Sequence, residues 1–307
     1  MLSVVIERIT GQPYRDAVQD LLLKPFGLSH MVLGRRAPII KKHVMGYTIN
    51  PQGQMENALT CDSILPLGAG AYFSSADDLT RYIADLFSDN VPAAVHQMMF
   101  HNVSLEDGTK VNYLPAALVE SDFYGHKRFG HGGGYFGFLA YMAYYPDDKV
   151  AIVVLTNTDS VESKSGNLPT SATVSRISHV VLGIPEPKIA DLPLSSSEAK
   201  AYVGTYRLRE FITGINSDTV TFFYTQNSLF MKIGSGTPRA NWYAAEKSVK
   251  KEPGRPMQGA VQLLNQGNGR FLQKGTNDGE VTFINGRGAH PSVRIGEWFS
   301  GSIVAKN

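Results

Sequence analysis

The sequence predicts an α+β protein, with helices flanking an antiparallel sheet, followed by a small antiparallel β barrel or sandwich. Three observations lead to this fold class. Apolar residues recur at helical spacing near the N-terminus and again after residue 75. An apolar and aromatic hairpin covers residues 135–157, and short β-type runs separated by Gly, Asn and Ser fill the chain beyond residue 198.

Two helices are expected at the N-terminus. The first ten residues carry apolar side chains at positions i, i+3, i+4 and i+7, and Gly11 is suited to end that helix. A second helix is expected between Pro13 and Pro25. No Ser, Thr, Asp or Asn precedes the first helix as a cap, so the chain is expected to begin partway through a helix.

Further helices follow. Ser75 is an expected N-cap, with Asp77 and Asp78 in the first turn of a helix that directs Leu and Ile side chains inward. Shorter helices are expected at residues 93–100 and 171–182.

The stretch "GIPEPKIADLPLSSSEA" is rich in Pro and Ser and marks a domain boundary. We therefore assign residues 1–185 to a first domain, residues 186–197 to a linker and residues 198–307 to a small β-rich domain. Six short β-type runs support that last domain: "YVGTYRL", "TVTFFYT", "SLFMKI", "AVQLLN", "GRFLQK" and "GEVTFI". "QNS" and "NDG" are expected as hairpin tips between such runs.

The composition excludes several classes of function. The formal net charge is +2, and the densest basic stretches are short and broken by Pro and Gly, so no nucleic-acid partner is expected. Cys61 is the only cysteine and no HExxH is present, so neither a metal site nor another cofactor is predicted. No apolar run is long enough to span a membrane, and no targeting signal is visible, so no compartment is assigned.

The stretch "RFGHGGGYFGF" (residues 128–138) is the strongest candidate for a functional motif. "HGGG" occurs as the oxyanion loop of lipase-type hydrolases, but their G-x-S-x-G nucleophile motif is absent, and "GLSHM" around Ser29 lacks the second glycine. From the residues alone, a purely structural interpretation also stays open, in which His131 marks a turn and the glycines relieve packing.

Three blocks together resemble the serine β-lactamase and penicillin-binding-protein superfamily, in its class C-type, His-x-Gly branch. "RFGHGGGYFGFLAYMAYYPDDKVAIVVLTN" is similar to the family's C-terminal strand hairpin, which carries Lys-Thr-Gly or His-x-Gly. "VVIERITGQPYRDAVQDLLLKPFGLSHM" resembles its helix pair, and "LPLGAGAYFSSADDLTRYI" resembles its Ser-Thr-x-x-Asp helix start. The blocks occur in the family's order and cover residues 1 to about 183.

The resemblance implies roles for five residues. Gly134 would supply a backbone N–H to an oxyanion hole. His131 would stand where the family keeps a Lys or His that orients the substrate or assists proton transfer. Gly132 and Gly133 would let the substrate approach the strand, and Tyr135 would line the mouth of the site.

The nucleophile that this chemistry needs is not found. Ser-x-x-Lys occurs only at Ser197–Lys200 and Ser248–Lys251, downstream of the glycine box, and we interpret both as chance matches. Tyr-x-Asn is absent as well. The nearest match, "YTIN" (Tyr47 to Asn50), has the wrong spacing and place. The resemblance therefore implies an N-terminally incomplete family member, whose sheet would be completed by a missing segment or by another copy in a homo-oligomer.

The expected function is that of a β-lactamase-related serine hydrolase, which transfers an acyl group from a small-molecule or peptide substrate through a serine acyl-enzyme. This chain by itself is expected to be inactive. The substrate, whether β-lactam, peptide or ester, is not predicted. The alternative is a non-catalytic protein that binds a peptide or acyl ligand in the glycine-lined groove. The C-terminal domain, through "YVGTY", resembles the family's lipocalin-like appendage.

Overall fold

The computed structural model divides into two compact units, residues 1–101 with 114–161 and residues 102–113 with 162–307, and each is described by itself. The structure describes all residues except 35–38, 51–52, 60–67, 71, 105–109, 112, 160–168, 186–187, 211–215, 234–259, 275–279, 285–291, 296–298 and 306–307. The predicted turn "NDG" and Cys61 lie outside the described residues.

The first unit begins with the two expected helices. Helix α1 (Leu2–Thr10) ends at Gly11, whose φ of 67° is left-handed. Helix α2 (Tyr14–Val18) continues directly into a π-helical turn, η1 (Gln19–Leu23). The apolar stripe of α1 lies on the surface, since Leu2 and Ile9 are 67% and 79% exposed. Helical periodicity therefore identifies the shared face but not whether another element covers it.

Helix α3 (Ala76–Asp85) is capped as predicted, because the Ser75 hydroxyl accepts a hydrogen bond from the Asp78 N–H at 3.2 Å. The short helix α4 (Ala93–Met99) follows it. The first unit also contains two short strand pairs, β1 (Val32–Leu33) with β4 (Tyr72–Phe73) and β2 (Tyr47–Ile49) with β3 (Met55–Asn57). In the second unit, β5 (Val103–Ser104) pairs with β6 (Lys110–Val111).

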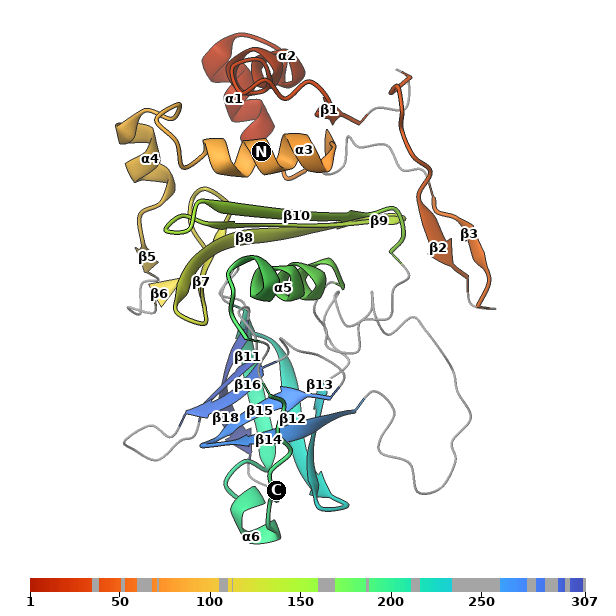
Figure 1. The fold of residues 1–307 in the computed structure, drawn as a ribbon, viewed down its shortest axis with the longest axis vertical. Coiled ribbons are helices and arrows are strands. Elements are labelled where there is room, and N and C mark those ends of the chain that lie inside the picture. The colour runs from red at the N-terminus through yellow and green to blue at the C-terminus, as the bar shows by residue number, and fades with distance from the viewer. Residues whose placement is uncertain are drawn as a thin grey trace. The chain divides into compact units, whose positions relative to one another are not determined.

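The central sheet of the first unit is antiparallel, in the order β10-β9-β8-β7. Its strands are β7 (Val119–Phe123), β8 (His126–Tyr135), β9 (Phe138–Tyr145) and β10 (Val150–Thr156). Helix α3 lies along one face of this sheet and packs on β9 and β10 (Figure 1). Their shared core includes Ile83, Leu86, Phe129 and Tyr144, which confirms the inward face predicted for α3.

The sheet differs from the prediction at one point. The sequence predicts one apolar strand from Tyr135 to Tyr145, but the chain reverses at Phe136 and Gly137, so Tyr135 belongs to β8 and pairs with Phe138 of β9. The left-handed φ of 75° at Gly137 permits this tight turn. The glycine box therefore occupies the last residues of one strand, directly before a hairpin tip.

The second unit contains α5 (Pro169–Val181), the short helix α6 (Ser196–Ala199) and a closed antiparallel barrel. The barrel runs in sequence order, and β11 closes it by pairing with both β12 and β18. This confirms the barrel alternative of the predicted fold class. Its strands are β11 (Gly204–Glu210), β12 (Asn216–Thr225), β13 (Ser228–Ile233), β14 (Val261–Gly267), β15 (Arg270–Gln273), β16 (Glu280–Ile284), β17 (Ser292–Ile295) and β18 (Phe299–Ala305).

Side chains fill the barrel interior. Phe222 and Phe271 are fully buried and contact the ring of Phe283 at centroid distances of 4.8 and 5.7 Å. Tyr206 lies in the same core and its hydroxyl donates to the Tyr202 carbonyl at 3.2 Å. Burial raises the pKa of Tyr206 to about 12, so the ring remains a neutral core residue. None of the described helices is long and apolar enough to cross a membrane.

Candidate functional site

Strand β8 extends beyond its neighbour β7. Pairing between them ends at Val119 opposite Gly130, and among the described strands none pairs with the outer side of residues 132–134. The chain before β7 turns away, because Ala117 has a φ of 56° and the Leu114 N–H donates to the Leu118 carbonyl at 2.8 Å. The glycine-rich end of β8 is therefore a sheet edge.

The register of the hairpin determines which peptide groups face this edge. Tyr135 and Phe138 flank the two-residue turn, and hydrogen-bonded and non-hydrogen-bonded pairs alternate along an antiparallel ladder from such a turn. Gly134, opposite Leu139, and Gly132, opposite Tyr141, occupy the non-hydrogen-bonded positions. Their N–H and C=O groups are consequently directed away from β9 and toward the edge.

Among the described residues, packing does not require glycine at the exposed positions 133 and 134. A Cβ at Gly133 would lie 3.8 Å from the Ala140 Cβ, and one at Gly134 would lie 3.4 Å from the Leu139 side chain, which are ordinary contacts. Gly130 is different, since a Cβ there would lie 2.9 Å from the Met142 carbonyl oxygen. Relief of packing accounts for Gly130, whereas the described neighbours of Gly133 and Gly134 leave room for a side chain.

His131 lies on the face of the sheet that α3 covers. His131 follows Phe129, a residue of the core under α3, by two positions, so their side chains share one face. It also pairs with Met142, which packs against that core. Tyr135 shares this face by the same alternation and is half-buried. His131 and Gly134 thus lie three residues apart on β8. The His131 side chain lies on the face that α3 covers, and the Gly134 peptide group faces the edge.

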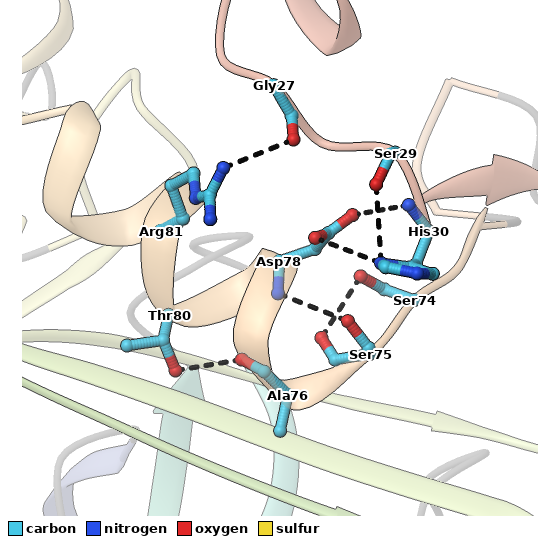
Figure 2. A network of polar contacts seen from close by, with 9 residues as sticks. All are labelled: Gly27, Ser29, His30, Ser74, Ser75, Ala76, Asp78, Thr80 and Arg81. Atoms are coloured by element: carbon cyan, nitrogen blue, oxygen red, sulfur yellow. Dashed lines mark hydrogen bonds and ion pairs between the residues drawn. The ribbon is translucent and has the colours of Figure 1, made fainter.

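Figure 2 shows a polar network where the loop after η1 meets the start of α3. The buried Asp78 carboxylate accepts the His30 N–H at 2.6 Å and lies 3.5 Å from His30 Nδ1. The Ser29 hydroxyl approaches the same Nδ1 at 3.4 Å. A catalytic triad needs serine and aspartate on different ring nitrogens, so this cluster fastens the loop to α3 rather than activating Ser29.

The serine of one Ser-x-x-Lys match has a structural role. Ser197 and Lys200 lie at the short helix α6, where Ser195 and Glu198 form a capping box. The Ser195 hydrogen bonds lower the pKa of the exposed Glu198 carboxyl. The Ser197 hydroxyl lies 3.0 Å from that of Ser195, within the cap. The other match, Ser248–Lys251, lies outside the described residues.

Sequence reasoning missed the contact between the glycine-box hairpin and the β2–β3 arm, which comprises residues 43–50 and 53–59. "YTIN" begins strand β2, and Tyr47 forms a parallel bridge with Thr158 just after β10. Gly46 was the available signal, because its Cβ would lie 2.6 Å from the Phe138 ring. In the described part of the chain, no three His, Cys, Asp or Glu side chains gather as a metal site requires.

Comparison with known proteins assigns the chain to a family. The family model described as beta-lactamase matches residues 1–171. Penicillin-binding protein 4* of Bacillus subtilis (strain 168) is 22% identical over 234 residues, covering 68% of this chain and 49% of that protein. The chain therefore spans about half the length of this curated relative.

Two solved structures share the fold at low identity. An octameric penicillin-binding protein homologue from Pyrococcus abyssi aligns with a TM-score of 0.51 at 15% identity, covering 98% of this chain and 62% of that chain. SurE aligns with a TM-score of 0.52 at 16% identity, covering 98% and 66%. These two similarities show the fold, and the family model, which covers more than half of the chain, shows that the chain belongs to the beta-lactamase family, a family of serine hydrolases.

Proposed function

We propose that this chain carries the substrate side of a serine-dependent acyl-transfer site, and that it binds such a substrate without cleaving it by itself. The substrate would lie along the edge of β8. There the Gly134 N–H would hold the carbonyl oxygen that becomes negative in the transition state. His131 would orient the substrate or assist proton transfer, and Tyr135 would line the mouth of the site.

The observation that carries this proposal is the contrast between the glycines of β8. Gly130 is explained by its packing against Met142, whereas Gly133 and Gly134 are exposed and, among the described residues, have room for a Cβ. A side chain at those two positions would instead meet a ligand running along the edge. This favours the substrate role of the box over the alternative that its glycines relieve packing.

Benzylpenicillin provides the first test. We expect the chain to bind it reversibly, with no mass adduct, no burst with nitrocefin or p-nitrophenyl acetate and no fluorophosphonate labelling. Gly133→Val should abolish binding while leaving the fold intact, and His131→Ala should weaken it about fivefold, the effect of one hydrogen bond. Titration followed by the amide resonances of β8 measures both, and intact-mass spectrometry detects any adduct.

Lys127→Val is the matched control on the same strand. Lys127 is paired with Glu120 at 3.0 Å, well before the glycine box, so its loss should leave binding unchanged. Unaltered affinity in Gly133→Val would refute the placement of the ligand. A stoichiometric covalent adduct on any serine would refute the claim that the chain does not cleave alone.

The sheet also offers a surface for a partner strand. Strand β10, "VAIVVLT", contains no charge or proline and pairs, among the described strands, only with β9. Such an apolar edge favours pairing with another strand, so we propose a homo-oligomer or a further segment of the protein at this edge. The Pyrococcus abyssi homologue is octameric, which supports association without fixing its geometry.

Light scattering tests the oligomer. The chain should show a mass above its 33.6 kDa, and Leu155→Lys should shift it toward the monomer because Leu155 is 37% exposed on β10. Val180→Lys is the control, since Val180 is 80% exposed and belongs to α5 rather than to β10. A stable monomer in all three proteins would exclude self-association through β10.

We propose esters as well as amides as substrates of this site. Esterase activity would use the same oxyanion donor as amide hydrolysis, because both reactions place negative charge on a carbonyl oxygen. The lipocalin-like assignment of the barrel draws on its sequential strand order, which lipocalins share. We propose that the barrel does not hold a ligand inside, because aromatic side chains fill its interior.

A further inference from the structure

We infer that Asp159 is a positioning residue, which fixes the tip of the β8–β9 hairpin and thereby the Gly134 N–H. Its carboxylate oxygen Oδ2 accepts the Gly137 N–H at 2.7 Å. Gly137 is buried at the turn, so water would not readily replace the carboxylate as acceptor, and its removal would leave this N–H unsatisfied. Hydrogen bonds to an ionised carboxylate are stronger than those between neutral groups.

The main chain of Asp159 fastens the β2–β3 arm at the same place. Its N–H donates to the Tyr47 carbonyl at 3.3 Å, and the Tyr47 N–H donates to the Asn157 carbonyl at 2.9 Å. The Asn157 side-chain amide donates to the Met45 carbonyl at 3.0 Å. Residues 157–159 therefore link the arm on one side to the hairpin tip on the other.

The arm and the tip cross with almost no space between their backbones. A Cβ at Gly137 would lie 2.8 Å from the Gly46 carbonyl carbon and would collide with the Ala58 Cβ. The Ala58 N–H donates to the Gly46 carbonyl at 2.9 Å, which closes the neck of the arm. The crossing limits how far the tip can shift toward the arm, and the Asp159 carboxylate opposes motion away from it.

The consequence reaches the proposed site through the short hairpin. Gly134 pairs with Leu139, only one pair from the turn that Asp159 holds. A tip that opens would tilt the last peptide groups of β8 and move the Gly134 N–H from its direction at the edge. The inference rests on the proposed function for the importance of Gly134, but the linkage itself is a property of the fold.

Amide hydrogen exchange of the full chain without ligand, followed by mass spectrometry, tests this linkage. Asp159→Ala should speed exchange about tenfold in residues 134–138, because the Gly137 N–H loses its acceptor. Residues 45–48 keep the main-chain hydrogen bonds to residues 157–159 and should change less. Asp159→Asn keeps an oxygen acceptor at the same place and should restore exchange to within about threefold of the original. Residues 219–233 of the barrel should not change in either variant.

Asp148→Ala is the matched control, since Asp148 pairs with His126 at 2.8 Å at the other end of the sheet. It should speed exchange near residue 126 and leave the tip unaffected. Unchanged exchange at residues 134–138 in Asp159→Ala would overturn the inference. So would equal acceleration by the Ala and Asn variants, or acceleration throughout the sheet. The exchange experiment contains no ligand, so failure of benzylpenicillin to bind would count against the proposed function and not against this linkage.

Discussion

Replacing Gly137 with alanine is expected to lower the free energy of unfolding by about 2–5 kcal/mol, since two penalties add. Its φ of 75° is left-handed, which costs a residue with a Cβ about 1–2 kcal/mol. The new methyl group would also collide with the Ala58 Cβ and lie 2.8 Å from the Gly46 backbone, which cannot rotate away as a side chain would. Urea unfolding followed by circular dichroism measures the loss.

Gly125→Ala separates the two penalties. Gly125 lies at the tip of the β7–β8 hairpin with a φ of 89°, and a Cβ there would meet nothing within 4 Å. This variant should lose only the conformational part, about 1–2 kcal/mol. Equal losses in the two variants would mean that the crossing of the arm and the hairpin tip contributes nothing to stability.

Phe222→Ala is expected to cost about 3–5 kcal/mol, the usual range for truncating a buried phenylalanine. Phe222 is fully buried in the barrel and contacts Tyr206 and Phe283 edge to face, at centroid distances of 5.3 and 4.8 Å. The cavity would open among aromatic rings that cannot easily collapse into it. Urea unfolding of the variant gives the difference directly.

The neighbouring residue provides the control for Phe222. Phe223 points to the outside of the barrel by strand alternation, is half-buried and stacks on Phe230 at 5.6 Å. Phe223→Ala should therefore cost only about 1 kcal/mol. A similar loss at both positions would contradict a filled interior, and the barrel would then have to be considered as a ligand carrier.

The local signals in the sequence predicted much of the fold. Ser75 caps α3, Gly11 ends α1, and "QNS" forms a two-residue turn with Gln226 and Asn227 at φ of 51° and 56°. Each of these depends on a few neighbouring residues and on backbone geometry that only some residue types adopt. Strand β17 was missed because it is only four residues long, and β18 because Gly and Ser interrupt its apolar pattern.

The candidate site was predictable only in part, because contacts between distant segments leave no periodic signal. The glycine box identified the strand, but the end of β7 at Val119 and the bridge from Tyr47 to Thr158 depend on pairing across the sheet. The exposed stripe of α1 illustrates the same limit. Amphipathicity predicted the helix, whereas only the packed structure could say whether its apolar face was covered.

The difference in length between β7 and β8 defines how much of the β8 edge is left unpaired by β7. Strand β8 continues for five residues, 131–135, beyond the last pair with β7, which corresponds to about 16 Å of extended chain. An extended ligand of roughly five residues would match that length. In the proposed site, the bend at Ala117, which lies outside the glycine box, would thus set the upper length of a ligand that pairs with the edge.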